Sequence, residues 1–193
     1  MIALLNFVRI IPKPRLRYTL IGAYTLACLW SFIALIEDTY EAGQCSTGLI
    51  ESYVPFDEDK ELFIVAIPDN YKGLYMFRDY TGDGISFKES LEWIGKKPTT
   101  NTFINILQYN QRRPDDVIKV DVIDSQTLHV GFPQIGNWWW IDGIGASDYE
   151  NEHYIVELKS GYYKLTMKNP HPDQVFLYPV ANKWQYKTWD SDK

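Results

Sequence analysis

The longest hydrophobic feature of the chain is an uncharged run of 19 residues, Tyr18–Ile36. As an α-helix rising about 1.5 Å per residue it would be roughly 28 Å long, close to the hydrocarbon thickness of a bilayer. A cleaved signal peptide usually has a shorter apolar core of about 7–15 residues, followed by a small-x-small site. Here the segment after the run offers only Tyr40 and Ala42 at that spacing. The pattern therefore predicts a retained membrane-spanning helix, with a cleaved signal peptide and a lipoprotein anchor at Cys28 as the alternatives.

Beyond this run the hydrophobic pattern is mainly that of strands. The clearest pair is 153–159 and 162–168, two alternating segments on either side of Ser160 and Gly161, which predicts a β-hairpin with a two-residue turn. A short apolar run that ends at Pro68 reads as a buried strand. The strands expected besides the hairpin are 61–68, 73–79, 117–124, 127–132 and 174–180.

Helical patterns are fewer in this part of the chain. Residues 86–97 predict one short helix, with Ser86 as its N-cap and Gly95 as its stop. Residues 99–113 are compatible with either a helix or a strand, and Pro114 ends them in both cases. We therefore expect at most two short helices among many strands.

These elements predict the organisation of the chain. Residues 1–17 form a basic N-terminal segment, 18–36 the membrane anchor and 37–61 a polar tether. Residues 62–193 are long enough to bury a single core. The expected fold of that region is a β-rich α+β domain, either a sandwich or a curled antiparallel sheet with one or two short helices.

Charge divides sharply on the two sides of the apolar run. Residues 1–17 carry four basic side chains and no acidic one, whereas residues 37–193 carry the other 15 basic and all 25 acidic side chains, a formal charge of −10. Because basic residues are retained on the cytoplasmic side of a membrane, the N-terminus is expected in the cytoplasm. The chain is thus predicted to be a single-pass cell-membrane protein whose C-terminal domain lies outside, in the periplasm if the cell is bacterial.

The acidic domain and the scarcity of cysteine exclude several kinds of function. A region of charge −10 repels the phosphates of nucleic acid, and it favours a basic protein partner with fast association. Only Cys28 and Cys45 are present, and the first lies within the apolar run, so neither a disulfide scaffold nor a cysteine-based zinc site is expected.

Catalytic motifs are also missing from the sequence. It contains no G-x-S-x-G, H-E-x-x-H, phosphate-binding Walker loop or G-x-G-x-x-G pattern. His129 and His171 show no partner in sequence, and the acidic run around His153 is typical of a solvated loop. The chain is therefore predicted not to be an enzyme, although an unrecognised envelope hydrolase is a third alternative.

The stretch from Asp79 to Glu89 resembles part of a calcium-binding loop. Asp79, Asp83 and Gly84 fit its first, fifth and sixth positions, but the twelfth position, which needs a bidentate carboxylate, is Ser90. Glu89 precedes that position by one residue. We therefore expect a turn that leads into a helix and no cofactor, with calcium bound by Asp79, Asp83 and Glu89 as the alternative.

Three consecutive tryptophans, Trp138, Trp139 and Trp140, are the other unusual feature. On a strand they alternate between the two faces of a sheet, so at least one indole is expected on an accessible surface. Large rigid aromatic side chains stack on sugars or anchor protein partners, and the same rings also fill cores. The three tryptophans are the predicted binding patch.

The sequence thus predicts a membrane-anchored extracytoplasmic module that binds without catalysis. The preferred ligand is another envelope protein, and the module would act as an immunity, inhibitor or assembly factor. The alternative is a carbohydrate-binding module that uses the ridge Trp138–Trp140.

Overall fold

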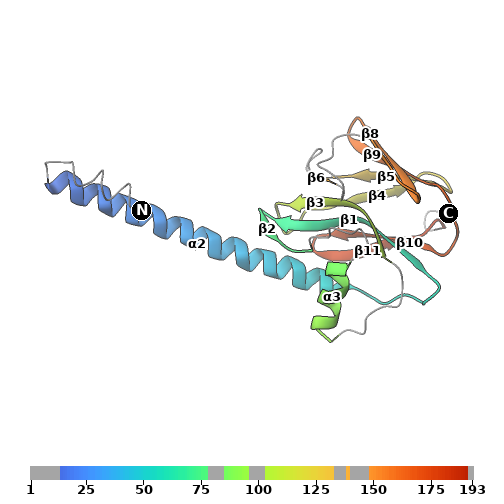
Figure 1. The fold of residues 1–193 in the computed structure, drawn as a ribbon, viewed down its shortest axis with the longest axis horizontal. Coiled ribbons are helices and arrows are strands. Elements are labelled where there is room, and N and C mark those ends of the chain that lie inside the picture. The colour runs from blue at the N-terminus through green and yellow to red at the C-terminus, as the bar shows by residue number, and fades with distance from the viewer. Residues whose placement is uncertain (1–13, 78–84, 96–102, 133–137, 140–147, 191–193) are drawn as a thin grey trace. The chain divides into compact units, whose positions relative to one another are not determined.

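The computed structural model describes residues 14–77, 85–95, 103–132, 138–139 and 148–190 (Figure 1). The chain divides between Tyr40 and Glu41 into two compact units. The first unit is helical, and the second is the β-rich domain.

The helix α2 runs from Pro14 to Ser52 without interruption. Its N-terminal part is long and apolar enough to cross a membrane, and none of the apolar stretch is buried. Proline is well placed at the start of a helix because the first amide has no intrahelical partner. This agrees with the prediction that Tyr18–Ile36 forms a helix that is long and apolar enough to span a membrane.

The helix also continues well into the segment 37–61, which the sequence predicted to be a polar tether. Ala42, Cys45 and Leu49 are buried there, and their spacing of three and four residues puts them on one helix face. Isolated among polar neighbours, these three positions were not recognised as an apolar stripe. Within the predicted tether, only residues 53–60 form a connection without helix or strand.

The first sheet is mixed and has six strands among the described residues. Its order is β11-β10-β1-β3-β6, with the short β2 paired to β1, and β1 runs parallel to both β10 and β3. The ambiguous segment 99–113 thus contains an inner strand of this sheet, β3. The strands are β1(Glu61–Tyr71), β2(Leu74–Tyr75), β3(Phe103–Gln111), β6(Trp138–Trp139), β10(Gln174–Val180) and β11(Lys183–Lys187).

The second sheet is antiparallel throughout, in the order β4-β5-β9-β8-β7. The predicted hairpin is confirmed: Lys159 pairs with Tyr162, and Gly161 takes a φ of 94° in the turn. A glycine suits this conformation because it has no Cβ to clash with the backbone. The strands are β4(Lys119–Val122), β5(Thr127–Gly131), β7(Tyr149–Glu150), β8(Tyr154–Lys159) and β9(Tyr162–Met167).

Two hydrophobic clusters cover the two faces of the mixed sheet. Phe63 and Val65 of β1 face the antiparallel sheet, and Leu62 and Ile64 face the opposite way. That second face is covered by α3(Ile85–Trp93) and by the last turns of α2 (Figure 1). The domain is therefore β-rich with two sheets, as predicted, but the parallel pairs make it neither a plain sandwich nor a curled antiparallel sheet.

Several predicted boundaries were wrong. Pro68 does not end its strand, because the pairing of β1 with β3 shifts between Pro68 and Asn70 and then resumes to Tyr71. Ser86 lies inside α3, and its carbonyl accepts the hydroxyl of Ser90. Gly95 does end the helix, with a φ of 75°. The last strand, β11, was not predicted because it is short, polar and at a sheet edge.

Candidate functional site

The predicted tryptophan ridge begins on an edge strand. Trp138 and Trp139 form β6, where they pair with Tyr109 and Gln108 of β3. Trp140 and the two side chains of β6 lie outside the described residues. The division of the indoles between two faces therefore stays a prediction.

The predicted calcium ligands are described only in part. Glu89 lies in α3, whereas Asp79 and Asp83 fall outside the described residues. Among the residues that the structure does describe, no group of three or more His, Cys, Asp or Glu side chains is placed to hold a metal ion. The calcium alternative thus also stays a prediction.

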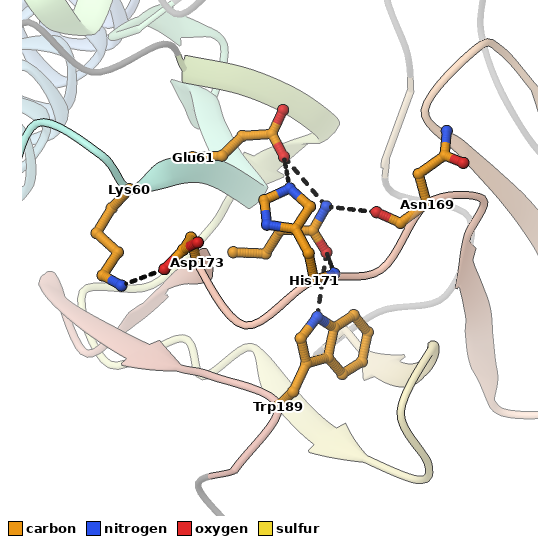
Figure 2. Close-up of polar contacts among 7 residues, drawn as sticks. Lys60, Glu61, Asn169, His171, Asp173 and Trp189 are labelled. Carbon is orange, nitrogen blue, oxygen red and sulfur yellow. Dashed lines mark hydrogen bonds and ion pairs between the residues drawn. The ribbon is translucent and has the colours of Figure 1, made fainter.

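A polar cluster lies at the beginning of the mixed sheet (Figure 2), and four of its hydrogen bonds are made by the Gln174 side chain. The Gln174 amide nitrogen donates to the Glu61 carboxylate and to the Asn169 carbonyl, each at 3.1 Å. Its oxygen accepts from the Trp189 indole at 3.1 Å and from the His171 amide at 3.4 Å. One buried side chain therefore joins β1, the loop before β10 and the C-terminal segment.

His171 has a partner that the sequence did not reveal. Its Nε2 lies 3.1 Å from the Glu61 carboxylate, and the nearby ammonium of Lys60 bonds Asp173 at 2.7 Å (Figure 2). The hydrogen bond from Lys60 holds the pKa of Asp173 below its usual range. A histidine–carboxylate pair can move protons, but the hydrogen bonds described for His171 and Glu61 join them to each other, to Gln174 and to the Asp173 backbone, and none of these involves a hydroxyl or a thiol. The contacts favour a structural fastening.

A second polar group lies at the other end of β1, where β1 and β2 form a hairpin. The Tyr71 hydroxyl donates to Glu41 of α2 at 2.6 Å, and the Lys72 ammonium donates to the same oxygen at 2.9 Å. The bond from Tyr71, followed by that from Lys72, lowers the pKa of Glu41. Burial and the bond to Glu41 raise the pKa of Tyr71 to about 12. The carboxylate is therefore ionised and the phenol protonated at neutral pH, which keeps both contacts.

The turn between β10 and β11 packs against the last turns of α2. Ala181 and Asn182 have φ values of 47° and 60° in this two-residue turn, and the Asn182 side chain accepts from the Gln111 amide at 2.6 Å. A Cβ added to Gly48 would lie 2.8 Å from the Asn182 carbonyl oxygen. The glycine thus permits a close approach of the helix to the turn.

Cys45 is expected to be unreactive in the folded protein. It is buried, and burial raises the pKa of its thiol from 9.0 to about 11. Since the thiolate is the nucleophile, the pKa alone slows its reaction with a maleimide at pH 7 about 100-fold. In a Cys28→Ala background, mass spectrometry should find Cys45 unlabelled under native conditions and labelled in denaturant. Fast native labelling would show that this end of α2 does not stay packed.

Tyr109 presents an uncompensated polar group. Its ring is buried, and its hydroxyl has no hydrogen-bond partner in the described part of the chain. Burial also raises the pKa of this phenol. Because an unsatisfied buried hydroxyl costs about 1–3 kcal/mol, Tyr109→Phe is expected to stabilise the domain by about 1 kcal/mol. Urea unfolding followed by fluorescence measures this, with Tyr163→Phe as a comparison at another buried tyrosine. A loss of stability would reveal a partner for the Tyr109 hydroxyl.

Comparison of the chain with family models, curated proteins and solved structures gave no significant match. The candidate sites are therefore those that the described residues define. The polar groups around Gln174 and Glu41 were missed from sequence because each joins residues far apart in the chain. His171 beside Glu61 and Glu41 beside Tyr71 carried no local signal.

Proposed function

We propose that Tyr18–Ile36 spans a membrane and that the β-rich domain acts outside the cytoplasm as a non-catalytic module that binds another envelope protein. The observation that carries the proposal is the single helix α2. Its N-terminal part is apolar and unburied, and its last turns supply Ala42, Cys45 and Leu49 to the domain. A domain built onto the end of such a helix stays at the membrane surface.

The exposed side chains of the domain support a protein partner. Trp93 is 92% exposed and Ile94 50% exposed at the end of α3, and Tyr186 is exposed on β11. Exposed tryptophan and tyrosine side chains are typical anchors of protein interfaces. The acidic charge of the region outside the membrane favours a basic partner. An immunity protein, an inhibitor and an assembly factor would each need such exposed anchors and a surface charge that complements its partner.

Anchoring and orientation are tested on intact cells or spheroplasts. Protease added outside should digest the domain and leave residues 1–17 protected, and the mature protein should begin at Met1. A C-terminal reporter that is active only outside the cytoplasm gives an independent reading. A mature chain that begins near Gly43, or a domain protected from external protease, would refute the proposal.

Partner binding is tested with a photo-crosslinking amino acid at position 93 in the full chain, expressed in its own cells. We expect one main protein adduct, and the same probe at the exposed Ser125 should give none. The adduct should weaken at high salt if the partner is basic. If the probes at positions 93 and 125 crosslink to the same proteins, the result would argue against a specific interface at α3.

Carbohydrate binding is the second candidate, because Trp138 and Trp139 lie on an edge strand of the mixed sheet. Aromatic side chains at such a site can stack on sugar rings. A pull-down with isolated cell-wall polysaccharide distinguishes the two candidates. Retention that is lost in Trp138→Ala and Trp139→Ala, and kept in Trp93→Ala, would favour the sugar ligand.

A further inference from the structure

Two exposed tyrosines bracket the apolar part of α2. Tyr18 is 72% exposed and Tyr40 is 68% exposed, and they are 22 positions apart in the chain. In a helix this separation is about 33 Å, close to the thickness of the hydrocarbon layer. Tyrosine is enriched at both membrane–water interfaces, where its ring is apolar and its hydroxyl is hydrated. Tyr40 thus marks the level of the outer headgroups, given the spanning orientation proposed above.

The β1–β2 hairpin is fixed to the very next residue. Glu41 follows Tyr40 directly, and its carboxylate accepts from the Tyr71 hydroxyl at 2.6 Å and from the Lys72 ammonium at 2.9 Å. Adjacent Cα atoms are about 3.8 Å apart, so the residue to which the hairpin is bonded is the direct covalent neighbour of Tyr40. The link depends on one covalent bond and on contacts inside the domain.

The hairpin has the side chains that suit this level. Lys72 and Gly73 form its tip with φ values of 49° and 92°, which turns the chain sharply. Tyr75 on β2 is 70% exposed, and its neighbours Leu74 and Met76 are half-buried against the cluster of Ala42, Cys45 and Tyr71. A lysine ammonium can reach lipid phosphates while its stem covers apolar surface, and a tyrosine ring suits the interface.

We infer that the β1–β2 hairpin lies in the outer headgroup layer of the same membrane, where Lys72 and Tyr75 contact phospholipid headgroups. The inference rests on the membrane-spanning part of the proposed function, but not on the identity of a protein partner. It makes Glu41 the residue that fastens the membrane-facing hairpin to the end of the anchor.

The test uses a fluorescent thiol label on the full chain in phospholipid vesicles. Tyr75→Cys in a Cys28→Ala background places the label on the hairpin, and the buried Cys45 is expected not to react. The control is Ser125→Cys in the same background. Ser125 lies in the β4–β5 turn, where the Gln126 carbonyl accepts from Met167 at 2.8 Å. The loop that follows Met167 leads to Gln174, which pairs with Glu61 at the start of β1, and the hairpin lies at the other end of that 11-residue strand, about 33 Å away.

A nitroxide on the lipid headgroup is expected to quench the label at position 75 at least threefold more than the label at position 125. Aqueous iodide should show the reverse order. Equal quenching at the two positions by both quenchers would overturn the inference.

Native Cys28, labelled before reconstitution, reports separately on the membrane-spanning helix. Its label should be quenched by a nitroxide that is attached deep in the acyl chain. If Cys28 is quenched and position 75 is not, only the hairpin inference fails; if Cys28 is not quenched, the spanning helix fails as well.

Discussion

Gly48→Ala is expected to lower the free energy of unfolding by about 1–3 kcal/mol, the usual cost of overpacking a tight contact. The new Cβ would lie 2.8 Å from the Asn182 carbonyl oxygen, which is a backbone atom and cannot rotate away. The Gln111 amide also holds the Asn182 side chain at 2.6 Å. The helix α2 would therefore have to move away from the β10–β11 turn.

Gly43→Ala is the matched control on the same helix. A Cβ at Gly43 meets nothing within 4 Å, so only the higher helix propensity of alanine acts. We expect a gain of about 0.5–1 kcal/mol there. Urea unfolding of the full chain in detergent, followed by tryptophan fluorescence, gives both values. Two changes of the same sign would mean that the end of α2 is not packed on the domain as described.

Gln174→Ala is expected to lower the free energy of unfolding by about 2–4 kcal/mol, because it removes several hydrogen bonds of a buried amide and leaves their partners incomplete. The side chain is 3% exposed and bonds Glu61, Asn169 and Trp189. Trp189 would also be held less firmly, since its ring packs on Phe176 with centroids 4.8 Å apart.

Lys60→Ala is the comparison in the same cluster. It removes the ion pair between Lys60 and Asp173, whose side chains are 29% and 45% exposed. Such pairs contribute little, so the midpoint of unfolding should change far less than in Gln174→Ala. The tryptophan fluorescence of the chain, to which Trp189 contributes, should become more quenchable by acrylamide only in the Gln174 variant. Similar effects of the two substitutions would refute the central role of Gln174.

Local patterns predicted the elements that depend on neighbours in sequence. The alternation on both sides of Ser160 and Gly161 predicted a hairpin, which the register of Lys159 with Tyr162 confirms. Gly95 was predicted to stop α3 because it can adopt a positive φ, and it does so. In both places the information is held within a few residues of the turn.

The same reasoning did not decide the structure where partners come from distant segments. Residues 99–113 were compatible with either a helix or a strand, and parallel pairing with β1 makes Phe103–Gln111 the inner strand β3. A strand that is buried on both faces is apolar at nearly every position. It therefore lacks the alternation of apolar and polar residues by which a strand is recognised in a sequence. The predicted tether likewise lacked a long apolar run; in the fold Ala42 and Cys45 pack with Tyr71, and Leu49 packs in the cluster that covers the outer face of the mixed sheet.

The sequence by itself determined the apolar helix, the charge difference on its two sides and the β-rich nature of the domain. These features depend on hydrophobicity and on turns, which are properties of short segments. Tertiary structure alone decided the parallel sheet, the burial of the last turns of α2 and the polar groups around Gln174 and Glu41. Each of these features brings together residues that are far apart in the sequence. Glu61 and Gln174, for example, are more than 100 positions apart. Only the closed fold brings them within hydrogen-bonding distance, and no local pattern encodes that meeting.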